Sequence, residues 1–103
     1  FMKIGGIMLT GKDRVKLRTM AQKIDPLIQI GKGGISENLL DSASNILDKR
    51  ELLKVKLLRN ADIEKEEAAT ALCQLLKAEL VQQIGNVLVL YRRSDKKDVV
   101  HIL

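Results

Sequence analysis

Aromatic side chains are almost absent from this chain of 103 residues, which has no tryptophan and, beyond Phe1, only Tyr91. Binding modes that stack several bases on exposed aromatic rings are therefore excluded. The single cysteine, Cys73, excludes an internal disulfide framework and indicates a reducing compartment, so we expect a cytoplasmic protein. No run of about 18 apolar residues occurs, and no membrane contact is expected.

Residue patterns for catalysis and metal binding are also missing. His101 is the only histidine. Neither an acid nor a nucleophile can be paired with it, so we interpret it as a tail residue without a role. Zinc sites need a cluster of cysteine and histidine ligands, and the chain has one residue of each kind. We therefore predict no enzyme, no metal, no cofactor and no small-molecule substrate.

The length suits one compact domain with a single core. Residues 1–7, FMKIGGI, are interpreted as an artificial leader before a start at Met8. We expect the domain to span residues 8–94 and a tail to follow at residues 95–103. A monomer is expected.

Positive charge predominates, with a formal net charge of +5 and a pI near 9.5. Residues 8–34 hold six basic side chains against two acidic ones, and a second basic group lies at residues 92–97. Two separated basic clusters favour a polyanionic partner. The alternative is that the charge serves only solubility.

The first predicted helix covers residues 10–24, in which apolar residues recur at helical spacing. Thr10 and Asp13 match a capping box at its start. Pro26 ends it, because the residue before a proline avoids helical dihedrals. Lysines group on the side of this helix opposite its apolar stripe.

Two further helices are predicted. Ser36 is the expected N-cap of one, and Asp62 that of the other. Acidic residues in the first turn of the third helix suit the helix dipole better than metal binding: Glu64, Glu66 and Glu67. The apolar stripes comprise Leu39, Leu40, Ala43, Ile46 and Leu47, and then Ala69, Leu72, Cys73, Leu76 and Leu80.

Strand patterns occupy the remaining segments. LIQI at residues 27–30 predicts a short strand, and LLKVKLL at residues 52–58 alternates between leucine or valine and lysine. LVQQI and VLVLY flank Gly85-Asn86, which predicts a hairpin with a type II′ turn. The order α-β-α-β-α-β-β predicts an α/β fold with a four-stranded mixed sheet, mostly parallel with an antiparallel hairpin at the end.

The glycine cluster in LIQIGKGGIS, residues 27–36, poses the main functional question. A phosphate-binding loop of the form G-x-x-x-x-G-K-[ST] does not fit. A dinucleotide fingerprint fails because Ser36 stands at its third glycine position. The segment does match G-x-x-G between a strand and a helix, where bare main chain lets a nucleic-acid backbone approach. The alternative is a glycine turn that serves only chain geometry.

Four segments together resemble the CRM domain (chloroplast RNA splicing and ribosome maturation), in its small bacterial YhbY-like form. They are LTGKDRVKLR, PLIQIGKGGIS, ELLKVKLL and LVQQIGNVLVLYRR. The resemblance covers about residues 9–93. It implies a fold similar to the C-terminal domain of translation initiation factor three. It also implies RNA binding and association with precursors of the large ribosomal subunit.

The resemblance, carried over by position, implies that the loop Gly31, Lys32, Gly33 and Gly34 contacts RNA. Basic residues of the first helix would flank it: Lys12, Arg14, Lys16, Arg18 and Lys23. Arg92 and Arg93 are further candidates, with a solvated strand end as the alternative. Tyr91 is a core residue or an RNA contact, and Cys73 is expected in the core.

Few aromatic rings imply contacts to phosphate and sugar, with recognition by RNA shape. The sequence-based hypothesis is therefore a non-catalytic RNA-binding protein that assists ribosome assembly. A protein-interaction module stays open as an alternative, and so does a general nucleic-acid-binding protein without a ribosomal role.

Overall fold

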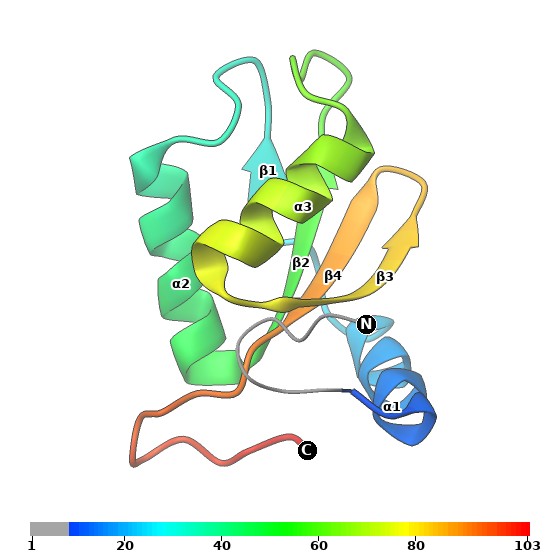
Figure 1. Cartoon of the computed structure of the whole chain (residues 1–103), viewed down its shortest axis with the longest axis vertical. Coiled ribbons are helices and arrows are strands. Elements are labelled where there is room, and N and C mark those ends of the chain that lie inside the picture. The colour runs from blue at the N-terminus through cyan, green and yellow to red at the C-terminus, as the bar shows by residue number, and fades with distance from the viewer. Residues whose placement is uncertain (1–8) are drawn as a thin grey trace.

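The structure, a computed structural model, describes residues 9–103, so the expected leader and the start at Met8 lie outside the described residues. Helices and strands follow one another in the predicted order (Figure 1). Their bounds are α1 Gly11–Ala21, β1 Ile28–Ile30, α2 Glu37–Arg50, β2 Leu52–Leu57, α3 Lys65–Leu76, β3 Glu79–Ile84 and β4 Val87–Tyr91.

The four strands form one mixed sheet, as predicted, and their order, which was not predicted, is β1-β2-β4-β3. The expectation that the sheet is mostly parallel was wrong. Only β1 and β2 are parallel, whereas β4 is antiparallel to both β2 and β3. The reason is that α3 carries the chain past β2 to the far edge of the sheet. The tight hairpin then returns β4 into the gap.

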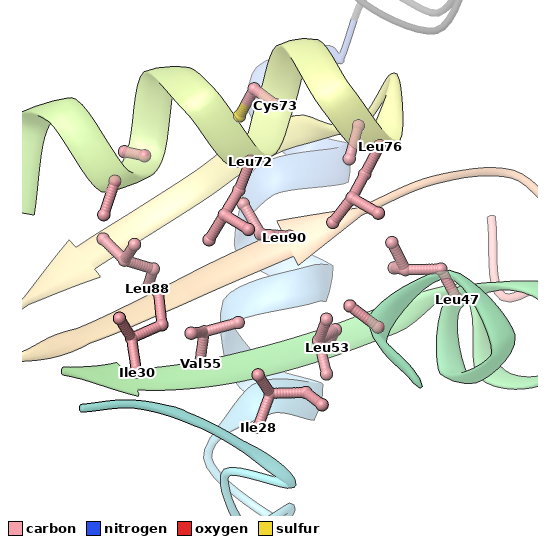
Figure 2. Close-up of a cluster of buried hydrophobic side chains, with 14 of the residues drawn as sticks. Ile28, Ile30, Leu47, Leu53, Val55, Leu72, Cys73, Leu76, Leu88 and Leu90 are labelled. Carbon is pink, nitrogen blue, oxygen red and sulfur yellow. The ribbon is translucent and has the colours of Figure 1, made fainter. Parts of the chain in front are cut away.

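Helices cover both faces of the sheet. α2 and α3 pack on one face, and α1 packs on the other (Figure 1). Leu53, Val55 and Leu57 of β2 are buried toward α2 and α3, whereas Leu52 is buried toward α1. Figure 2 shows the larger core, where side chains of α3 meet those of β2 and β4. The predicted helical stripes are confirmed except for Leu80, which lies in β3.

Side-chain caps set the starts of two helices as predicted. In the capping box of α1, the amide of Asp13 donates to Thr10 Oγ1, and the amide of Thr10 donates to Asp13 Oδ2, both at 3.1 Å. The Ser36 hydroxyl accepts from the amide of Leu39 at the start of α2. Asp62 was the wrong cap for α3, because the chain becomes helical only after Glu64, whose side chain makes no capping hydrogen bond.

α1 ends at Ala21, earlier than the predicted residue 24 and well before Pro26. Lys54 of β2 stabilises this end, because its ammonium donates to the carbonyls of Ala21 and Ile24, both at 3.1 Å. Cations beside the last carbonyls of a helix stabilise its C-terminus. Carbonyls at and just after the C-terminus of α1 are thus satisfied by a residue of the sheet on which the helix packs.

The β3–β4 hairpin has the predicted turn. Ile84 pairs with Val87, which leaves two residues in the loop. Gly85 has φ +55°, and Asn86 is not among the positive-φ residues. This combination fits type II′ and not type I′, which needs positive φ at both positions.

The tail after β4 is held by a buried carboxylate. Glu51, fully buried in a left-handed conformation (φ +64°) at the end of α2, accepts hydrogen bonds from the amide of Ser94 at 2.6 Å and the amide of Ile102 at 2.9 Å. Its Oε2 also lies 2.6 Å from Nδ1 of His101. The interpretation of His101 as a tail residue without a role was therefore wrong.

These contacts hold the tail against a second, smaller core, which lies between α1 and the sheet. Ile102 and Leu103 pack against the cluster that α1 forms with the sheet. Burial acts to raise the pKa of the Glu51 carboxyl, but the hydrogen bonds from His101, Ser94 and Ile102 outweigh it and hold that pKa below its ordinary value of 4.5. The charged form of Glu51 thus stabilises the folded state.

Acid should release this tail. Because the folded-state pKa of Glu51 is lowered, its stabilisation is present above about pH 4.5 and is lost as the pH falls through the folded pKa. Glu51→Gln should lower the unfolding free energy at neutral pH by about 1–3 kcal/mol. It should also flatten the acid loss in urea titrations between about pH 6 and about pH 3.

The matched control is Asp95→Asn, an exposed carboxyl of the same tail. It should leave both quantities close to the parent values. Equal acid sensitivity of the parent and Glu51→Gln would contradict the role given to this carboxylate.

Candidate nucleic-acid interface

The glycine loop joins β1 to α2 at the end of the sheet shown uppermost in Figure 1. Its turn closes with a hydrogen bond of 3.0 Å from the amide of Gly34 to the carbonyl of Gly31. Gly34 has φ +67°, a conformation that L residues adopt at a cost. Lys32 and Gly33 between them are exposed. No heavy atom lies within 4 Å of the position that a Cβ at Gly33 would take.

The loop after β2 packs against the glycine loop. The amide of Leu58 donates to the carbonyl of Ile30 at 2.9 Å. A Cβ added at Gly31 would lie 3.4 Å from Leu58 Cδ1 and 3.6 Å from Asn60 Oδ1. Arg59 is exposed in this second loop. Sequence reasoning missed Arg59, although parallel strands place their following loops at the same edge of a sheet.

α1 presents a basic outer surface. Four of the predicted contact residues are exposed on it or just after it: Lys12, Lys16, Arg18 and Lys23. Arg14 is different, because its Nη1 donates to the carbonyls of Leu80 at 2.8 Å and Val81 at 3.3 Å. Arg14 therefore fastens α1 to β3, a role that sequence reasoning did not assign to it.

α1 does not flank the glycine loop, contrary to the expectation from the resemblance. Figure 1 shows the β1–α2 loop at the top and α1 at the lower right. α1 packs on Leu52, Val81, Val89 and Tyr91. Leu52 begins β2 and Tyr91 ends β4, so the helix covers the sheet end opposite the loop. The two features therefore form one surface only if something between them is also accessible.

A row of side chains on the α1 side of the sheet fills that interval. Cross-strand pairing places Gln29 beside Lys56, Lys56 beside Val87, and Val87 beside Ile84. Paired residues share one face of a sheet. We call these four residues the open row, because three are exposed and Val87 is half-buried. Gln29 lies two residues before Gly31, and so the open row leads to the glycine loop.

The second basic cluster, at residues 92–97, also contains both an arginine used inside the fold and an exposed one. Arg92 is largely buried, and its guanidinium donates to the carbonyls of Leu76 and Ser44, both at 2.9 Å, and to Asp48 Oδ1 at 2.9 Å. It ties α2 to the end of α3. Arg93, its neighbour, is exposed.

Two other candidate residues lie in the core. Tyr91 is 1% exposed and packs under α1, which favours the core interpretation over an RNA contact. Cys73 is buried as expected, and burial, followed by the charge of Glu79, raises the pKa of its thiol to about 11. Neither residue is presented to a ligand.

Residues 9–103 hold neither a candidate metal cluster nor a membrane-spanning helix. This part of the chain contains no group of three or more His, Cys, Asp or Glu side chains arranged to hold a metal ion. None of its helices is long and apolar enough to cross a membrane. The exposed features described above, namely the glycine loop, the open row and the exposed face of α1, make up the candidate interface.

Comparison with known proteins decides the family. Residues 9–92 match the CRS1 / YhbY (CRM) domain. The chain belongs to this family. Among its relatives, a Bacillus subtilis protein named "Probable RNA-binding protein YqeI" is 39% identical over 92% of this chain and 99% of its own. A Haemophilus influenzae protein named "RNA-binding protein" is 36% identical over 88% of this chain and 92% of its own.

A solved structure agrees with the fold. The solution structure of a Staphylococcus aureus protein, described provisionally as RNA binding, has 46% sequence identity and a TM-score of 0.72. It covers 88% of this chain and 95% of its own. Membership in the CRM family supports the expectation that this chain is not an enzyme.

Proposed function

We propose that this CRM-domain protein binds RNA without catalysing a reaction, associates with ribosomal RNA in precursors of the large subunit, and assists ribosome assembly. The observation that carries the proposal is the open glycine loop at the end of the two parallel strands, with Lys32 exposed at its tip. A backbone without side chains lets an RNA strand approach closely. The names of the relatives support RNA as the polyanion.

The RNA path runs from α1 across the sheet to the glycine loop. Lys12, Lys16 and Arg18 line its start, Lys56 of the open row its middle, and Lys32 its end. Arg59, beside the glycine loop, is a further contact, whereas Arg14 and Arg92 act through internal hydrogen bonds. This path replaces the simpler idea that the helix flanks the loop.

Binding through lysines and bare backbone favours contacts to phosphate and sugar. Such contacts position an RNA without reading its sequence directly. Specificity for a ribosomal precursor then comes mainly from the three-dimensional shape of the RNA. The alternative of a protein-interaction module predicts instead that the lysines contribute little to any RNA complex.

The salt dependence of binding tests the electrostatic part. The logarithm of RNA affinity should fall linearly with the logarithm of salt concentration, because each phosphate contact releases counterions. Lys12→Ala with Lys16→Ala should weaken binding to unrelated RNAs alike and flatten the slope by about one unit per lost contact. Fluorescence anisotropy over a salt series measures both effects.

A second double variant, Lys49→Ala with Lys97→Ala, is the matched control, because both lysines are exposed and neither lies on α1. It should keep most of the parent slope. A salt-insensitive complex would favour the protein-interaction alternative, and equal slopes for the two double variants would place the footprint elsewhere.

The glycine loop can be tested by adding bulk and negative charge. Lys32→Asp and Gly33→Asp should each remove most RNA affinity, since a carboxylate there repels phosphates across a short gap. Both variants should stay folded, because Lys32 is exposed and Gly33 has open space and no positive φ. Affinity and melting temperature are measured on the same samples.

Two controls separate the causes. Lys97→Asp makes the same charge change at an exposed lysine in the tail. Gly33→Asn adds a side chain of similar size without charge. If Lys32→Asp and Gly33→Asp bind RNA as well as the parent, the loop is only a turn and its assignment as a contact surface is wrong.

The ribosomal role is tested by sedimentation of the full chain with ribosomal particles in a low-salt gradient. We expect it to travel with large-subunit precursors, and the Lys32→Asp variant to stay at the top of the gradient. Co-migration of the parent with small subunits alone, or with no particle, would contradict the ribosomal role. RNA binding in the anisotropy assay would then support a general nucleic-acid-binding protein.

A further inference from the structure

A hollow of about 150 Å³ lies between the C-terminal half of α1 and the open row. Ile84 and Val87 of the open row contribute its apolar floor. Ile84 is 59% exposed, although it is a large apolar residue in a strand. Polar side chains form the rim: Arg18, Gln22, Lys54 and Gln82.

The charge around this hollow is of one sign. None of the described residues that line it carries a carboxylate, whereas Arg18 and Lys54 are both cationic. The Lys54 ammonium uses two donors on the carbonyls of Ala21 and Ile24, and an ammonium has three. One donor therefore remains for a ligand, and the positive charge favours a ligand that offers hydrogen-bond acceptors and belongs to a polyanion.

We propose that this hollow receives one unpaired nucleobase of the bound RNA. The inference rests on the proposed function and adds a base-binding site to it. The aliphatic floor covers the face of the base, as aromatic rings do in other RNA-binding proteins. The two glutamine amides and the cations reach its edge, while Lys56 of the open row, the cross-strand partner of Val87 in the floor, meets a flanking phosphate.

The rim also favours certain bases. Arg18 and Lys54 only donate hydrogen bonds, whereas Gln22 and Gln82 can both donate and accept. A donor-rich rim prefers base edges that carry carbonyl oxygens, so uracil, which has two, fits better than adenine, which has none. The protein would then read a base even though residues 9–103, the part that the structure describes, expose no aromatic ring.

The size of the hollow limits the ligand. Pockets that enclose a whole small molecule typically measure about 300–1,000 Å³, and this one is smaller. It therefore fits a single planar ring system that is only partly enclosed and remains attached to a chain. RNA lying along α1 and the open row supplies such a ring.

The experiment compares two probes of equal length and charge, a 12-nucleotide oligouridylate and the corresponding abasic ribose-phosphate oligomer. If a base enters the hollow, the parent should bind oligouridylate about tenfold more tightly than the abasic oligomer, which is near the lower end of the range for a base stacked on an aromatic ring. Oligouridylate should also bind more tightly than oligoadenylate of the same length.

Two variants locate the effect. Ile84→Thr keeps a β-branched residue and removes apolar surface from the floor. It should lower the affinity for oligouridylate about fivefold and leave the affinity for the abasic oligomer unchanged. Gln82→Ala should reduce the preference for oligouridylate over oligoadenylate. Leu75→Ala is the matched control, because Leu75 is 60% exposed on α3, on the other side of the sheet, and should change neither probe.

The outcomes separate this inference from the proposed function. If the parent binds neither probe nor structured RNA, the proposed function fails. If the parent binds both probes equally, or if Ile84→Thr weakens both to the same extent, RNA binding stands and the base site is overturned. If the parent protein forms a dimer without RNA and Ile84→Thr dissociates that dimer, the hollow binds a second copy of the chain. This result would also overturn the base site.

Discussion

The side-chain alternation of β2 governs the arrangement of the whole domain. Leu53, Val55 and Leu57 turn toward α2 and α3 and form the centre of the larger core, while Lys54 and Lys56 turn toward α1. A shift of one residue in this strand would put both lysines into the core. Because one face of β2 must carry apolar residues for the larger core, the lysines lie on the opposite face. On that face α1 covers only part of the sheet.

The basic residues of this protein have two roles, internal hydrogen bonding and exposure at the surface, and the amino-acid composition does not distinguish them. Arg14, Lys54 and Arg92 donate to backbone carbonyls and hold helices in place. Lys12, Lys16 and Lys32 are exposed. The net charge of +5 thus overstates the charge that is available to a partner. Internal arginines also mean that a charge-removing substitution can weaken the fold rather than the interface.

Local signals were read correctly from the sequence because both partners lie within a few residues. The Thr10–Asp13 capping box and the Gly85 turn belong to this class. Contacts between distant residues were missed, since Arg14 and Val81 are 67 positions apart and Glu51 and His101 are 50 apart. The glycine loop was found by its own pattern. The open row was not, because its four members come from four strands whose order follows only from the tertiary fold.

β1 is a three-residue edge strand that, among the described residues, pairs only with β2, yet it carries the glycine loop. Edge segments with few backbone hydrogen bonds open at lower free energy than the centre of a sheet. The amides around the glycine loop should therefore exchange with solvent deuterium sooner than those of β2 and β4. A bound RNA would have to restrain this edge, and part of its binding free energy would be used to do so. The sign of this restraint would be slower amide exchange at residues 28–34 in the complex than in the free protein.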